Sequence, residues 1–272
     1  MRVPRTLRWL ALLLCVGYVA VSLVVMSLED RFIFFPMRGG QVTGPGQDVL
    51  LQADDGVKLQ ARYLAQPEAT QTLLYLHGNA GNLANRSELL VLLAHLGVNV
   101  LALDYRGYGQ SEGTPSEAGV YRDASAAYRW LRERTAPSNI VVLGESLGGG
   151  PACELALHQP VGALILQSTF TRIADMAALV FPWLPTRLIL RTRFDNLAKV
   201  RRIAVPKLFI HSARDEVIPY AMGQRLFAEA AAPKTSLWLT RSGHNDAFFV
   251  ETERMMSGVS AFLRGLASAP SR

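Results

Sequence analysis

The sequence predicts an α/β fold with a mostly parallel central sheet and helices on both faces, preceded by one N-terminal transmembrane helix. Three observations carry this prediction. Short apolar runs alternate with helical stretches through most of the chain, as in parallel α/β proteins. The runs are apolar throughout rather than alternating, which is typical of strands buried on both faces. One much longer apolar segment stands at the amino end.

This amino-terminal segment has the length and composition of a membrane span. Residues Trp9 to Leu28 are twenty positions without a charge, and a helix of that length spans about 30 Å, the thickness of the hydrocarbon core. Arg2, Arg5 and Arg8 precede it, so the positive-inside rule puts the N-terminus in the cytoplasm and the rest on the periplasmic or lumenal side. The alternative is secretion after signal-peptide cleavage. A signal peptide has an apolar core of only about 7–15 residues, which favours an uncleaved anchor.

We expect three parts: a cytoplasmic arm and anchor over 1–30, an α/β domain over 31–266 and a loose tail over 267–272. The stretch "DVLLQADDGVKLQARYLA" predicts a β-hairpin, because two alternating runs meet at Asp54, Asp55 and Gly56. Later strands are expected at "TLLYLH", "NVLALDY", "NIVVLG", "GALILQS", "KLFIHS" and "SLWLTR". A helix should follow each, except that a long insert at about 169–202 follows the fourth.

Composition limits the classes of partner. The formal net charge is +6, but the arginines are spread out and no nucleic-acid-binding motif accompanies them, so we expect a membrane rather than a nucleic acid. Two cysteines, Cys15 and Cys153, make no disulfide framework. The five histidines have no Cys or His companion at ligand spacing, so no metal or other cofactor is expected.

The glycine-rich stretch "LGESLGGGP" over 143–151 follows the apolar run "NIVV". A phosphate-binding loop would need a lysine after its last glycine, and Pro151 follows Gly150 here. Gly144, Ser146 and Gly148 instead form the pattern G-x-S-x-G, in which a strained strand-to-helix turn exposes a serine nucleophile. The alternative is an ordinary strand-to-helix turn.

A serine nucleophile needs a base and an acid, in the order Ser, then Asp or Glu, then His. Asp215 and His244 each stand just past an expected strand, where the active sites of parallel sheets form. We predict that His244 takes the Ser146 proton and that Asp215 orients the imidazole. Glu216 and Asp195 are alternative acids, and His244 could instead cap a helix.

An oxyanion hole would complete such a site. We expect one donor in the backbone N–H of Leu147, after the nucleophile, and a second in Asn79, in the loop "YLHGNAGN" after an early strand. His77 is expected to be structural because it comes too early in the chain for the base. The remaining histidines are expected in the core: His95, His158 and His211.

Five motifs together resemble a known family: "LHGNAGN", "DYRGYGQSEGTPSE", "GESLGGG", "RDEVIP" and "SGHND". They are similar to the membrane-anchored serine hydrolases of the Bem46/ABHD13/ABHD17 type in the α/β-hydrolase superfamily, from about Arg31 to Leu263. The resemblance implies the α/β-hydrolase fold, a single N-terminal anchor, and the same Ser146, Asp215 and His244. The depalmitoylating branch has an N-terminal cysteine cluster, where this chain has only Cys15.

The insert at about 169–202 is apolar and bears several arginines. It predicts either a helical segment that only covers the fold or a substrate cap, in which apolar side chains meet an acyl chain and an arginine meets an anionic head group. The candidate cap residues are Phe181, Trp183, Leu184, Arg187 and Arg191.

We therefore expect a serine hydrolase that cleaves carboxylic-ester or thioester bonds, of lipid or acyl substrates, through an acyl-enzyme on Ser146. A peptidase or amidase with the same triad and a non-catalytic membrane scaffold are the alternatives.

Overall fold

The computed structural model describes residues 4–267 and confirms the predicted α/β architecture. Within these residues an eight-stranded sheet has the order β10-β9-β8-β7-β4-β6-β3-β2. Its pairs are parallel except for those of β3 with β2 and with β6. The strands are β2 Gln47–Gln52, β3 Lys58–Leu64, β4 Thr72–Leu76, β6 Asn99–Leu103, β7 Ile140–Glu145, β8 Ala163–Gln167, β9 Lys207–Ser212 and β10 Lys234–Leu239.

The predicted hairpin is formed by β2 and β3. Gln52 lies opposite Lys58 in their antiparallel register, and the N–H of Ala53 donates to the carbonyl of Val57 across the turn. Gly56 has a φ of +85°, a left-handed conformation that a residue without a Cβ adopts at little cost. Two further short strands, β1 Phe35–Pro36 and β5 Ala80–Gly81, pair in parallel.

Helices cover both faces of the sheet and bury two apolar cores. Alternate residues of β4 show the division, because Leu74 and Leu76 belong to one core and Leu73 and Tyr75 to the other. One face is covered by α3 Glu117–Arg132, α4 Gly149–His158, α7 Asn196–Val200 and α8 Tyr220–Glu229. The other is covered by α2 Ser87–Ala94, α9 Ala247–Val250 and α10 Thr252–Ala267.

Three 3₁₀ turns complete this part of the chain: η1 Leu83–Arg86, η2 Pro137–Asn139 and η3 Ser146–Gly148. Helix α3 illustrates the local causes. The Ser116 hydroxyl accepts the N–H of Gly119 and caps its first turn. Val120, Ala124 and Ala127 then recur at helical spacing on its buried face.

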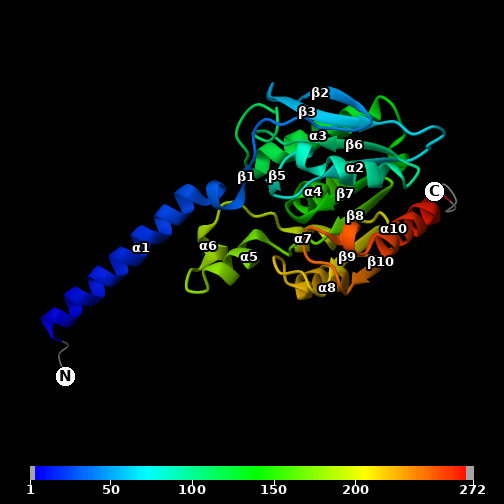
Figure 1. Cartoon of the computed structure of the whole chain (residues 1–272). Helices are drawn as coiled ribbons and strands as arrows, with labels where there is room; N and C mark the ends of the chain where they lie inside the picture. Colours follow the sequence, from blue (N-terminus) through cyan, green and yellow to red (C-terminus); the bar gives the residue numbers. More distant parts are fainter. Residues whose placement is uncertain (1–3, 268–272) are drawn as a thin grey trace.

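Helix α1 spans Arg5–Ile33 without a break at the expected domain boundary between 30 and 31. Among the described residues it is the one helix long and apolar enough to cross a membrane. It projects away from the sheet in Figure 1, yet Ser22, Glu29 and Ile33 are buried. Its last turns are therefore packed against the domain. Arg2 and residues 268–272 of the expected tail lie outside the described residues, and α10 ends at Ala267.

The expected insert contains three helices. Helix α7 belongs to the core, since Leu197 and Val200 are fully buried. Helices α5 Ile173–Val180 and α6 Thr186–Ile189 lie beside α1 in Figure 1, at the edge of the domain. We call the segment Ile173–Ile189 the α5–α6 insert.

Candidate active site

Ser146 stands at the sharp turn between β7 and α4. Its φ is +53°, a strained value for a residue with a side chain. A Cβ at Gly144 would lie 2.5 Å from the carbonyl oxygen of Gly148, and one at Gly148 would lie 1.9 Å from that of Leu76. Both positions therefore require glycine, and the turn has the geometry that the G-x-S-x-G pattern predicts.

The structure brings Ser146, His244 and Asp215 together. His244 Nε2 lies 3.0 Å from Ser146 Oγ, and His244 Nδ1 lies 2.9 Å from Asp215 Oδ2. Asp215 follows β9 and His244 follows β10, so both come from loops at the carboxyl edge of the sheet. The alternative acids have other partners. Asp195 caps α7, and Glu216 accepts the backbone N–H of His244 at 3.1 Å.

The side chain of Asp215 is fully buried, and its carboxylate lies within hydrogen-bond distance of several donor groups. His211 Nε2 lies 3.1 Å from Asp215 Oδ2, and the N–H groups of Val217 and Ile218 donate to Oδ1 at 3.0 and 2.8 Å. Burial alone would raise the pKa of Asp215, but hydrogen bonds from His211, His244 and Ile218 outweigh it and hold the pKa well below its usual range. The carboxyl is therefore ionised at neutral pH.

His211 is a residue that sequence reasoning assigned only to the core. It is buried as expected, but its contact with Asp215 has no signal in the sequence beyond its place four residues earlier. The same expectation was wrong for His95 and His158, which are exposed at the ends of helices α2 and α4. Each lies at a helix end, where water is accessible, rather than on the helix's buried face.

The loop that carries His244 is held by a buried carboxylate. Glu251 accepts the backbone N–H groups of Thr240, Arg241 and Ser242, and the hydroxyl of Ser242 donates to it as well. Burial would raise the pKa of Glu251, but these hydrogen bonds lower it to about 2. Sequence reasoning missed this residue because nothing local distinguishes it from other glutamates in helix starts.

The loop after β4 lies on the other side of Ser146. A Cβ at Gly78 would lie 3.2 Å from the Ser146 Cβ, so the backbone around Gly78 and Asn79 approaches the serine closely. The Tyr108 hydroxyl donates to the carbonyl of Asn79 at 2.7 Å. The side-chain oxygen of Asn79 accepts the N–H of Phe35 at 3.1 Å. Leu147 is the residue after Ser146, at the start of the helical turn.

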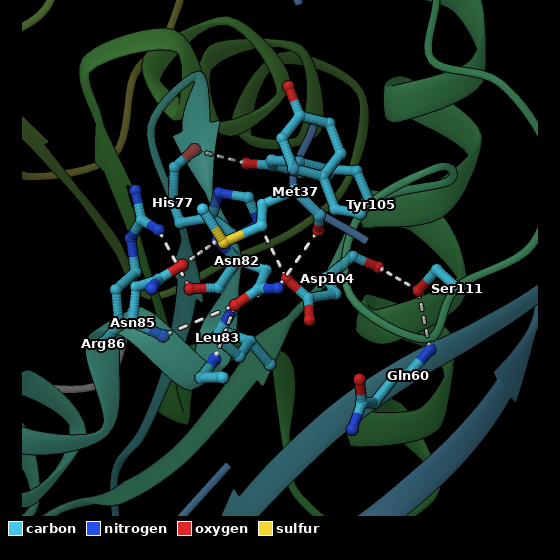
Figure 2. Close-up of polar contacts among 12 residues, drawn as sticks. Met37, Gln60, His77, Asn82, Leu83, Asn85, Arg86, Asp104, Tyr105 and Ser111 are labelled. Atoms are coloured by element: carbon cyan, nitrogen blue, oxygen red, sulfur yellow. Dashed lines mark hydrogen bonds and ion pairs between the residues drawn. The ribbon is translucent and has the colours of Figure 1, made fainter. Parts of the chain in front are cut away.

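A buried polar network fixes this loop, as Figure 2 shows. The Tyr105 hydroxyl donates to the carbonyl of His77 at 3.0 Å, and His77 Nε2 lies 3.2 Å from Asp104 Oδ1. The same carboxylate oxygen accepts the N–H of Leu83 at 2.9 Å. The Asn82 amide donates to carbonyls of the segment after β1. His77 thus lies within the network that supports the loop, as sequence reasoning predicted.

An apolar cavity of about 300 Å³ opens at Ser146. Its serine end consists of Asn79, Ser146 and Leu147. Most of the remaining lining is apolar, and much of it comes from α1 and the α5–α6 insert. We use the name apolar wall for five of these residues, two from α1 and three from the insert: Val25, Phe32, Val180, Phe181 and Leu184. Sequence reasoning predicted the contribution of the insert but not that of α1.

The remaining candidate cap residues lie elsewhere. Trp183 packs edge-on against Tyr18 of α1, with ring centroids 6.3 Å apart. Arg187 pairs with Asp175 at 2.7 Å and borders a neighbouring hollow. Arg191 Nε lies 3.2 Å from Glu29 Oε1.

Comparisons with known proteins agree with this architecture. A family model described as "alpha/beta hydrolase fold" matches residues 71–199. An uncharacterized protein of Mycobacterium tuberculosis is 36% identical over 89% of this chain and 90% of its own length. The alpha/beta hydrolase domain-containing protein WAV2 of Arabidopsis thaliana is 38% identical over 79% of each chain.

Among solved structures, the esterase Pf2001 of Pyrococcus furiosus is similar in fold, with a TM-score of 0.71 at 22% identity over 85% of this chain and 98% of its own. The elbow, the sheet order and the extent of the sequence matches lead to one conclusion. The chain belongs to the α/β-hydrolase family.

Proposed function

We propose that the protein is a serine hydrolase that cleaves carboxylic-ester or thioester bonds through an acyl-enzyme on Ser146. One observation carries the proposal: the relay of close contacts from Ser146 Oγ to His244 Nε2 at 3.0 Å, and from His244 Nδ1 to Asp215 at 2.9 Å. A serine hydroxyl is a weak nucleophile until a base within hydrogen-bond distance takes its proton. The family membership agrees with hydrolysis as the reaction class.

The acylation step follows from this relay. His244 Nε2 takes the proton of Ser146 as Oγ attacks the carbonyl carbon, and Asp215 stabilises the resulting imidazolium. The tetrahedral intermediate collapses, its bond to the leaving oxygen or sulfur breaks, and His244 returns the proton to that atom. A water then attacks the acyl-enzyme with His244 again as the base, which releases the carboxylic acid and restores Ser146.

The oxyanion of that intermediate needs donors. We assign the role to the backbone N–H groups of Leu147 and Asn79, which flank Ser146 at the serine end of the cavity. Leu147 is the second residue of the helical turn that leads into α4, so its N–H also lies near the positive end of the helix dipole. The close approach of the Gly78 backbone to Ser146 supports the assignment of its neighbour.

The apolar wall supports an acyl chain as the group on the carbonyl side. The cavity is lined almost wholly by aliphatic and aromatic side chains, with few polar groups besides those at the serine end and Glu29, as pockets for apolar ligands are. In this assignment Phe181 and Leu184 contact the chain. A head-group role for Arg187 or Arg191 stays a prediction, since each already pairs with a carboxylate.

A fluorophosphonate probe tests the proposal directly. We expect the wild-type protein to form a covalent adduct, and Ser146→Ala to form none while it remains folded. Folded wild-type protein that does not label would overturn the hydrolase assignment and leave the non-catalytic scaffold. A matched panel of ester, thioester and amide substrates with one acyl group then separates an esterase from a peptidase or amidase.

We also propose that α1 anchors the protein, with the N-terminus in the cytoplasm and the α/β domain across the membrane. The uncharged run over 9–28 and the arginines before it support this orientation. The orientation can be tested with a C-terminal fusion to a reporter that functions only outside the cytoplasm. We expect this fusion to show reporter activity. Cytoplasmic reporter activity would contradict the charge argument, and a secreted fusion shortened at its amino end would indicate cleavage.

A further inference from the structure

The cavity beside Ser146 has an unusual composition, because the anchor helix forms part of it. Val25 and Phe32 come from α1, whereas Val180, Phe181 and Leu184 come from the α5–α6 insert, about 150 positions later in the chain. A helix that only tethered a domain to a membrane would have no place in its substrate cavity. Helix α1 therefore has a second role that its hydropathy does not reveal.

Contacts between α1 and the domain fix this arrangement. Glu29 is buried and accepts the backbone N–H groups of Arg191 and Thr192 at 2.9 and 3.2 Å. Arg191 Nη2 in turn donates to the carbonyl of Met26 at 2.9 Å. Glu29 also accepts hydrogen bonds from the Arg191 guanidinium and the Thr192 hydroxyl. These donors together position α1 firmly against the segment that follows α6.

A second contact, between Tyr18 of α1 and Trp183, determines the depth of the α5–α6 insert in the membrane. Tyr18 donates its hydroxyl to the carbonyl of Trp183 at 3.2 Å, and the two rings pack edge to face. Tyr18 lies ten residues before Leu28, the end of the uncharged run, which is about 15 Å along a helix. If the run spans the bilayer, Trp183 lies well inside the hydrocarbon layer.

The surface of the insert suits that environment. Leu179, Val180, Trp183 and Leu188 are all more than half exposed, with Leu188 at 83%. Clustered exposed apolar side chains of this size mark a contact with a membrane or another apolar partner. Because α1 lies beside α5 and α6 (Figure 1), the bilayer that surrounds α1 also covers the insert. The occupant of this surface is therefore lipid.

The rim of the cavity lies in this surface. Val180 and Phe32 line the cavity and are also 66% and 53% exposed, so they stand where the cavity meets its surroundings, whereas Ser146 stands at the inner end. The exposed Arg191 guanidinium lies beside Glu29, directly after the apolar run. That level corresponds to the lipid head groups, where arginine is favoured.

From these observations we infer that the cavity is filled from the bilayer: an acyl chain leaves the lipid layer between α1 and the α5–α6 insert and reaches Ser146 along the apolar wall. This rests on the proposed hydrolase function and specifies its substrate as a long-chain acyl ester or thioester that resides in a membrane. We expect short, water-soluble esters to depend much less on the apolar wall, because they have no long acyl chain to contact it.

The first test places a larger side chain on α1 in order to narrow the cavity beside the apolar wall. The full chain is placed in phosphatidylcholine vesicles and assayed with p-nitrophenyl palmitate dissolved in them and with p-nitrophenyl acetate in the water. We expect Val25→Trp to lower the palmitate-to-acetate ratio of kcat/KM at least about tenfold, or about 1.4 kcal/mol. Leu23→Trp is the matched control, because Leu23 lies about 200° around the helix from Val25 and is exposed.

The second test makes the insert less apolar. We expect the double variant Leu179→Asp, Leu188→Asp to lose palmitate activity in vesicles while acetate hydrolysis persists, since an ionised side chain in the bilayer is costly. Leu50→Asp is its control, as Leu50 is 73% exposed on strand β2, at the edge of the sheet opposite β10.

Fluorophosphonate labelling accompanies every variant and separates the possible failures. Wild-type protein that does not label would overturn the proposed function and this inference with it. Variants that label normally but keep the wild-type palmitate-to-acetate ratio would overturn the inference alone. If Val25→Trp does not label, the smaller substitution Val25→Phe takes its place, with the same two readouts.

Discussion

The two ends of the cavity are built in different ways. The serine end lies on loops that follow β4 and β7, with His244 and Asp215 supplied by the loops after β10 and β9, and buried hydrogen bonds hold all of them. The apolar wall lies on α1 and the α5–α6 insert, which are partly exposed and meet at the edge of the domain. In the proposed function, bond cleavage and the choice of acyl group therefore reside in separate parts of the molecule, and mutations should affect them separately.

Asp215→Asn should cause the largest loss of activity, and the loss should come from the serine end of the cavity alone. We expect kcat to fall about 10⁴-fold for acetate and palmitate esters alike, because an amide cannot hold the imidazole in the required tautomer or stabilise its cation. Steady-state kinetics with both esters measure this. Glu216→Gln is the control, since it keeps an oxygen that can accept the His244 N–H. A loss for only one of the two esters would break the proposed separation.

Glu29→Ala should affect the apolar wall and spare the chemistry. The change leaves the N–H groups of Arg191 and Thr192 without their acceptor, and we expect it to lower the free energy of unfolding by about 3 kcal/mol. The palmitate-to-acetate ratio should fall as well, while fluorophosphonate labelling continues. Thermal unfolding in detergent and the two-ester assay report these effects. Glu29→Gln, which retains an acceptor oxygen, should lie between Glu29→Ala and wild type.

The pH dependence of the stability of Glu251→Gln tests how the loop that carries His244 is held. Glu251 has a lowered pKa of about 2 in the folded state, against about 4.3 in an unfolded chain. Its ionised form thus stabilises the fold fully above about pH 4.3, and that contribution is lost as the pH falls towards 2. We expect the variant to lose about 2 kcal/mol at pH 7.

The melting temperatures of wild type and Glu251→Gln, followed against pH, should converge in acid. The exposed neighbour Glu253 provides the control substitution Glu253→Gln, with little change at any pH. A gap between wild type and Glu251→Gln that stays constant down to pH 2 would contradict the assignment.

His211→Asn should have a smaller effect at the serine end. It removes one donor to Asp215 while His244 and the backbone N–H groups remain. The loss of one such hydrogen bond, about 1.5 kcal/mol, corresponds to about a tenfold fall in kcat. KM should hardly change, because His211 is not among the residues that line the cavity. A purely structural role would instead lower stability and leave the kcat of the folded fraction intact, which active-site titration detects.

Arg187→Ala should have the smallest effect. Arg187 already pairs with Asp175 and does not line the cavity beside Ser146, so we expect little change in the hydrolysis of either kind of ester. The ratio of hydrolysis of anionic to neutral lipid esters should change less than about fivefold. A larger and selective loss for anionic esters would restore the head-group role that the arginines of the insert suggest.

Sequence reasoning succeeded where chemistry restricts local residue choice. The elbow needs small residues on both sides of Ser146, and the steric contacts of Gly144 and Gly148 show why. The parallel part of the sheet was predictable because fully apolar runs alternate with helical stretches. The hairpin was predictable because two alternating runs meet at a turn that contains Gly56. The position of Asp215 and His244 beside Ser146 was predictable because the loops after parallel strands meet at one edge of the sheet.

What remained hidden depends on contacts between distant segments. Glu29 and Arg191 meet across 162 positions of sequence, and neither carries a mark of its partner. His211 is one residue in an apolar strand, and its orientation towards Asp215 depends on the loop after β9. The pairing of β1 with β5 involves strands of two residues each, too short for any periodic signal.

The continuity of α1 from Arg5 into the folded domain has a final consequence for how the proposed hydrolase would meet its substrate. A domain on a flexible tether turns in all directions and must find the membrane again at each encounter. With α1 as the proposed anchor, no linker separates it from the domain, and the mouth of the cavity would keep one orientation towards the lipid. Encounter would then depend on two-dimensional diffusion in the membrane plane, and a version cut free of α1 would lose both that orientation and part of its cavity.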